Sequence, residues 1–170
     1  GQWRAQGPWS SPALEVSGQA LGLRVLGSDL GDLSLHATHQ GRQTKLTVGP
    51  LLIQQVAALQ ARLPGLKGQL SAEISKEGAD SPTLSAHLQA PLLKDRLLPD
   101  VTLKGVVAAT GLSQVELSWQ LSPPLLLRGQ IGLVTHLAGE LQGQSLEAIL
   151  VGQLPLQGQA FGKFTYSSGL

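Results

Sequence analysis

Apolar and polar residues alternate along most of this 170-residue chain. Segments such as Leu33–Ala37, Leu70–Ile74 and Val115–Trp119 place an apolar side chain at every second position. In a β-strand, a repeat of two puts these side chains on one face of the sheet. The alternation therefore predicts strands with one apolar and one wet face. Such strands are typical of antiparallel sheets and not of parallel sheets, which are buried on both faces.

The charged residues of these segments fix which face is wet. Within the predicted strands, every one of them takes the parity opposite to the apolar residues: Arg24, Lys45, Glu73, Lys104, Glu116, Arg128, Glu140, Glu147 and Lys163. A slip of one residue in any strand would exchange its two faces and bury its charges. We therefore expect the strand register to be strongly specified.

Two segments depart from the alternation. After Gly49-Pro50, Leu52, Val56 and Leu59 recur at helical spacing, and Pro64-Gly65 ends the run. This pattern predicts one amphipathic helix over residues 51–62. Residues 1–12 contain Gly and Pro beside two Trp residues, and we expect an irregular lead there.

The strand pattern and the frequent Gly and Pro turns predict an all-β fold of about a dozen strands. An apolar sheet face cannot stay in water, because burial is worth roughly 25 cal/mol per Å² of apolar area. The short helix is too small to cover such a face. We therefore expect a single unit, an elongated, curved and mostly antiparallel sheet that folds lengthwise around an apolar groove, with one amphipathic helix.

Composition excludes several classes of protein. The net charge is +1 with charges scattered singly, so no basic patch predicts nucleic-acid binding. Cys is absent, which excludes disulfides and thiol chemistry. No apolar run reaches the roughly 18 to 20 residues of a membrane-spanning helix. We expect any membrane anchor to lie outside this chain.

No motif for catalysis or cofactor binding is present in the sequence. It contains no nucleophile elbow, no phosphate-binding loop and no dinucleotide fingerprint. The four histidines (His36, His39, His87 and His136) are spaced so that they do not converge on a metal. We therefore predict a protein that is not an enzyme and holds no metal or cofactor.

The apolar parity instead suits disordered acyl chains, because it offers a smooth aliphatic lining with few aromatic walls and few polar groups. We take these residues as candidates for the lining of the groove: Leu33, Leu35, Leu70, Ala72, Ile74, Leu84, Ala86, Leu88, Val101, Leu103, Val115, Leu117, Trp119, Leu127, Ile131, Leu146, Ala148 and Leu150.

Three segments resemble repeats of the TamB family of envelope proteins: LKGQLSAEI (66–74), PTLSAHL (82–88) and LPDVTLKG (98–105). The similarity covers residues 14–158, and it lies in the order in which the short motifs recur. The resemblance implies an interior piece of a long β-taco in the periplasm of a bacterium with two membranes. It implies transport of phospholipid between these membranes, or support for outer-membrane protein assembly. It also implies an outer-membrane barrel protein as a partner of a region outside this chain.

A structural or adhesive β-solenoid of the cell envelope is the alternative. Its dry, packed core would produce the same alternation without a lipid ligand.

Overall fold

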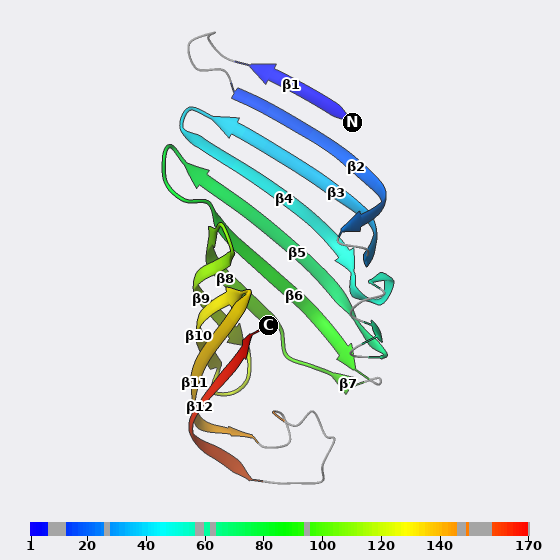
Figure 1. The fold of residues 1–170 in the computed structure, drawn as a ribbon. Coiled ribbons are helices and arrows are strands. Elements are labelled where there is room, and N and C mark those ends of the chain that lie inside the picture. Colours follow the sequence, from blue (N-terminus) through cyan, green and yellow to red (C-terminus); the bar gives the residue numbers. More distant parts are fainter. Residues whose placement is uncertain are drawn as a thin grey trace.

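The computed structural model describes residues 1–6, 13–25, 28–56, 60–61, 64–93, 96–145, 149 and 158–169. They form one 12-stranded sheet (Figure 1). The strands are β1 (Gln2–Gln6), β2 (Ala13–Val25), β3 (Ser28–Gln40), β4 (Gln43–Leu52), β5 (Leu66–Glu77), β6 (Thr83–Leu93), β7 (Arg96–Leu97), β8 (Val101–Ala108), β9 (Gly111–Trp119), β10 (Leu125–Gly132), β11 (Val134–Ser145) and β12 (Gln159–Gly169); a 3₁₀ turn, η1 (Ile53–Gln55), follows β4.

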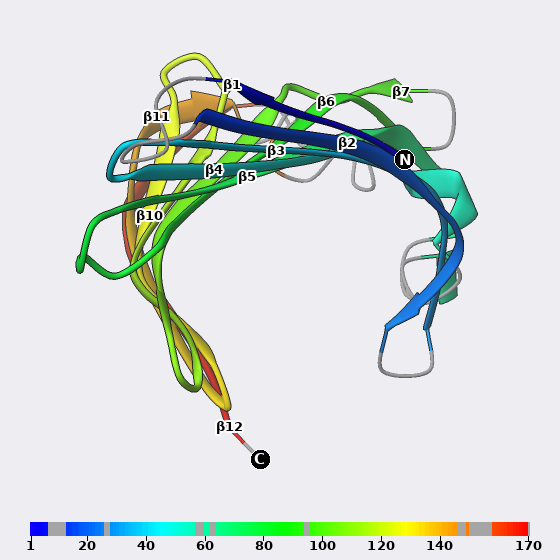
Figure 2. The same cartoon turned by 90° about the horizontal axis from the view of Figure 1, so that it is seen from above.

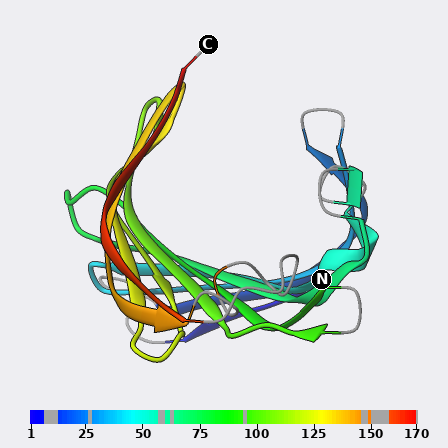
Figure 3. The same cartoon turned by 90° about the horizontal axis from the view of Figure 1, so that it is seen from below.

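The strands follow one another as an antiparallel meander. Each strand pairs with its neighbours in sequence, except that β7 pairs only with β6 and lies off the main path. The sheet bends into an open arc, which is visible along its edge (Figures 2 and 3). The all-β, antiparallel and curved character predicted from the sequence is therefore confirmed. The described strands do not form the parallel coils of a β-solenoid.

The helix predicted over residues 51–62 is wrong in its first half. Leu51 and Leu52 end strand β4, where they pair with Leu70 and Gln69 of β5. Ile53–Gln55 form the 3₁₀ turn, and Val56 has an extended backbone. The helical spacing instead reflects burial in the connection between two strands, since Ile53 and Val56 are 2% and 3% exposed. Residues 60 and 61 are helical, and the N–H of Gln60 donates to the carbonyl of Val56 (3.0 Å), so only a short helical piece is present among the described residues. Residues 57–59 and 62 lie outside the described residues.

The irregular lead predicted for residues 1–12 is also wrong in part. Residues 2–6 form strand β1 and pair with Ser17 through Ala13 of β2. Trp3 faces Val16 and Ala5 faces Leu14, so the alternation begins at the second residue of the chain. A strand of five residues beside Gly and Pro is too short to show a period of two clearly. Residues 7–12 lie outside the described residues.

The connection from β4 to β5 packs on the sheet and forms a small core. Val56 lies against Leu33 of β3 and Leu51 of β4, and these three are buried. Gln60 ties the connection together with its amide group. Its Nε2 donates to the carbonyl of Leu66 (2.6 Å) and to that of Ile53 (3.3 Å), and its Oε1 accepts from the N–H of Gly65 (3.2 Å).

We expect Gln60→Ala to lower the free energy of unfolding by about 2 kcal/mol, because it leaves part-buried backbone groups without partners. Gln54→Ala is the matched control, since Gln54 accepts one long bond of 3.5 Å from the N–H of Gly68. The control should cost less than about 0.5 kcal/mol. Urea denaturation of both variants checks this, and equal losses would contradict the role of Gln60.

Candidate functional site

The strand register brings the apolar residues into continuous rows across the sheet. Residues directly opposite each other in an antiparallel pair lie on the same face. One row, which we call the middle row, runs from β2 to β12 without a polar side chain: Gly18, Leu35, Val48, Ala72, Ala86, Leu103, Leu117, Leu127, Gly139 and Phe164.

Further rows flank the middle row on the same face. On one side are Leu51, Leu70, Leu88, Val101, Trp119 and Leu125. On the other side are Val16, Ala37, Leu46, Ile74, Leu84 and Gly105, and then Val115, Gly129, Leu137 and Tyr166. We call these rows together with the middle row the apolar face.

The residues proposed from the sequence as lining fall on the apolar face wherever the structure describes them. Leu33 lies two residues before Leu35 on β3 and therefore on the same face. Ile131 lies on this face opposite Leu112. Leu146, Ala148 and Leu150 lie outside the described residues. The proposed set omitted Val48, Leu125 and Leu137. The alternation in Lys45-Leu46-Thr47-Val48 is sufficient to predict that Val48 lies on the apolar face.

Most side chains on the apolar face are half-buried, and Val16 and Tyr166 near the ends of the sheet are 51% and 55% exposed. No second sheet packs on the face within the described residues, yet a few of its side chains are buried. Val115 is 2% exposed, Leu125 5% and Leu137 9%. Where a glycine occupies the face, side chains of the adjacent strands can pack against its backbone. A Cβ at Gly139 would stand 3.0 Å from Cζ of Phe164, so the Phe164 ring approaches the backbone of the next strand. The face is therefore packed within its own layer.

The opposite face carries most of the strand charges, although Lys76 lies two residues after Ile74 on β5 and therefore on the same side as the apolar face. Lys45 Nζ lies 2.7 Å from Glu73 Oε2, and Arg128 Nε lies 3.2 Å from Glu116 Oε2. Lys104 faces Glu116 across β8 and β9. Glu140 and Lys163 are opposite each other on β11 and β12. The predicted orientation is confirmed for these charges, whereas Glu147 and the side chain of Arg24 are not among the described parts.

The four histidines are spread over the sheet, and each has a polar partner on a neighbouring segment. His36 Nε2 lies 3.8 Å from Glu15 Oε1, and His87 Nε2 lies 3.2 Å from Asp100 Oδ2. His39 and His136 bond through Nδ1 to the hydroxyls of Thr44 and Ser167, each at 2.9 Å. No group of three or more metal-ligating side chains occurs within the described residues.

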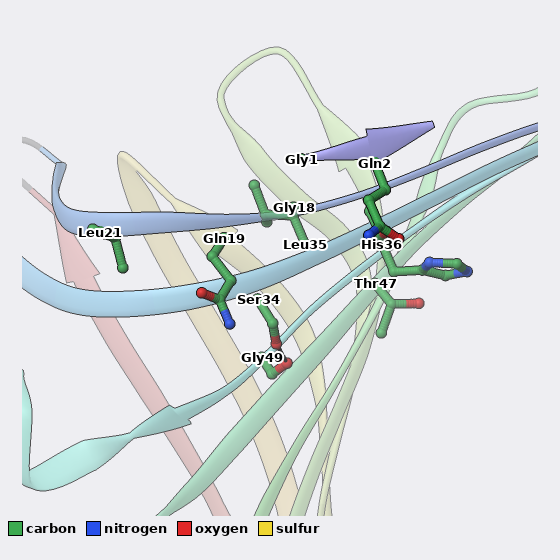
Figure 4. A pocket seen from close by; sticks show the side chains of 11 residues that line it. Gly1, Gln2, Gly18, Gln19, Leu21, Ser34, Leu35, His36, Thr47 and Gly49 are labelled. Carbon is green, nitrogen blue, oxygen red and sulfur yellow. Dashed lines mark hydrogen bonds between the residues drawn. The ribbon is translucent and has the colours of Figure 1, made fainter. Parts of the chain in front are cut away.

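A shallow hollow of about 680 Å³ lies beside the start of β1 (Figure 4). Its lining is mixed, with the polar side chains of Gln19, Ser34, His36 and Thr47 beside Leu21 and Leu35 (Figure 4). Ser34 Oγ donates to the carbonyl of Gly49 and not to the imidazole of His36. The hollow therefore presents no paired nucleophile and base.

No helix within the described part of the chain is long and apolar enough to cross a membrane. Comparison with protein-family models, with curated proteins and with solved structures finds no match for this chain.

Proposed function

We propose that the apolar face lines a groove for the acyl chains of phospholipids. In this proposal the chain is one segment of a conduit in the periplasm of a bacterium with two membranes, as the resemblance to the TamB family implies. The observation that carries the proposal is the middle row, which crosses the sheet from β2 to β12 without a polar side chain.

The bend of the sheet supports a groove on this side. When a sheet has no covering layer, side chains on the inner side of the bend crowd together and lose exposure. The low exposure of Val115 and Leu125 fits the inner side. The Arg128 side chain on the opposite face is 71% exposed, which fits the outer side. We therefore assign the apolar face to the inside of the arc.

The dimensions suit a chain that slides. With strands about 4.8 Å apart, the middle row extends over about 40 Å. One acyl chain in a bilayer leaflet spans about 15 Å, which is half of the hydrocarbon thickness. A lipid can therefore move along the row while its tails stay shielded. Each shielded CH₂ is worth about 0.8 kcal/mol, so such a path removes most of the barrier to leaving a membrane.

The lining offers little that would select a headgroup. Its members are aliphatic side chains and glycines, with three aromatic residues. The paired charges lie on the other face, and Gln144 and Lys76 are polar residues on the same side as the lining. Transfer of phospholipids between inner and outer membranes fits this lack of selectivity better than recognition of one small molecule. Support for outer-membrane protein assembly, with a barrel protein as partner, remains the second role that the resemblance implies.

We expect phospholipid to remain bound to the purified 170-residue chain, at about one molecule or more per chain. Mass spectrometry of an organic extract, compared with an unrelated β-protein purified from the same cells, measures this. A lipid content equal to that of the unrelated protein would contradict the groove and favour the structural, ligand-free alternative.

A further inference from the structure

One polar atom in a flanking row of the apolar face, at the end of strand β9, has no partner. Trp119 Nε1 is buried and donates no hydrogen bond, and it is the one buried side-chain nitrogen or oxygen in this state among the described residues. Trp119 lies on β9 between Val101 of β8 and Leu125 of β10. These directly opposite side chains are aliphatic and offer no acceptor.

Gln144 is the buried polar side chain with which Trp119 can be compared among the described residues. Gln144 is 1% exposed, and both ends of its amide have a partner: Oε1 accepts from the N–H of Gln142 (2.6 Å) and Nε2 donates to the carbonyl of Pro124 (3.2 Å). The chain therefore satisfies one buried amide close to β10 and leaves the Trp119 indole without an acceptor.

A buried donor without an acceptor is destabilising and rare in native proteins, so its persistence calls for an explanation, and a functional role is one. On a face of aliphatic side chains, the acceptor has to come with whatever occupies the face. An acyl chain of a phospholipid ends in an ester carbonyl, which accepts hydrogen bonds and lies at the border between apolar tail and polar head. The indole N–H and this carbonyl are complementary.

We propose that Trp119 Nε1 donates a hydrogen bond to the ester carbonyl of a phospholipid whose tail lies on the apolar face. Trp119 then acts as a positioning residue that sets where the lipid head stands along the groove. The inference rests on the proposed function and adds to it a preference for ester-linked lipids. The N–H is buried in the structure, so binding of the carbonyl requires a local movement around Trp119.

The test compares dihexanoyl phosphatidylcholine with its diether analogue, both below their micelle concentrations. The two lipids share headgroup and tails and differ in the carbonyl. One net hydrogen bond corresponds to about fivefold in affinity. We expect the diester to bind the 170-residue chain about fivefold more tightly than the diether, and Trp119→Phe to bind both equally.

A second readout needs no variant in the measured protein. The indole N–H proton of Trp119 should move downfield in a nitrogen–proton spectrum when the diester is added, and not when the diether is added. Trp119→Phe serves here to assign the signal. Equal affinities of the unaltered chain for the two lipids, without this shift, would overturn the role of Trp119 and leave the groove intact. Binding of neither lipid would overturn both proposals.

Discussion

Leu117→Arg is expected to remove bound lipid from the chain while the sheet still folds. Leu117 stands in the middle row between Leu103 of β8 and Leu127 of β10. It is half-buried, so a guanidinium at this position can bend toward water when no tail lies over it. A tail lying across the row would bury the charge, at several kcal/mol for an unpaired ion. Since 1.4 kcal/mol is tenfold, we expect lipid binding to weaken by at least about a hundredfold.

Ser118→Arg is the matched control for this prediction. Ser118 is the next residue of the same strand and lies on the opposite face, between Thr102 and Leu126. An Arg there remains in water whether or not lipid is bound. Mass spectrometry of extracts gives the lipid content, and circular dichroism with the yield of soluble protein checks the fold. Equal lipid in both variants, or equal loss in both, would contradict the assignment of the groove to the apolar face.

The two faces of the sheet could be predicted because two independent signals agree. Leu103 and Leu117 follow the period of two, and Lys104 and Glu116 occupy the alternate positions. The strand pairing places Leu103 opposite Leu117 and Lys104 opposite Glu116, so the apolar and the charged face each continue from one strand to the next. Burying a charge is costly, so the sequence tolerates few errors in parity.

The bulges could not be predicted, and each one exchanges the faces within a strand. Gln114, with a φ of 49°, is the extra residue of β9, and Gly143 is the extra residue of β11. As a result Gln144 turns toward the apolar face, where it is buried. Parity alone would have placed it with Glu140 and Gln142. A local pattern contains no information about a register shift that depends on the partner strand.

The helix predicted over residues 51–62 was wrong in its first half for a related reason, whereas residues 60 and 61 are helical. Spacings of three and four residues arise from a helix face, and they also arise where a strand end and a turn bury a few apolar side chains. Val56 is buried by packing on Leu33, which is far away in sequence. The order of the strands in the sheet was easier to predict than the connection between β4 and β5, because short turns join sequence neighbours in an antiparallel meander.

The sequence does not reveal where the backbones of two strands approach each other closely. Gly129 occupies such a place. This residue of β10 pairs with Leu137 of β11 and has a φ of 157°. A Cβ there would overlap the carbonyl oxygen of His136 and stand 3.1 Å from Cα of Leu137. Both obstacles are backbone atoms, so the two strands would have to separate.

We expect Gly129→Ala to lower the free energy of unfolding by about 4 kcal/mol or more, which is enough to unfold many domains of this size. Gly162→Ala separates the clash from the cost of the backbone conformation. Gly162 of β12 has a comparable φ of 142°, and no atom lies within 4 Å of an added Cβ. Its substitution should cost only about 1 to 2 kcal/mol of backbone strain. Urea denaturation followed by circular dichroism measures both losses. If they were equal, backbone strain alone would explain the glycine at position 129, and β10 and β11 would not depend on the close approach of their backbones.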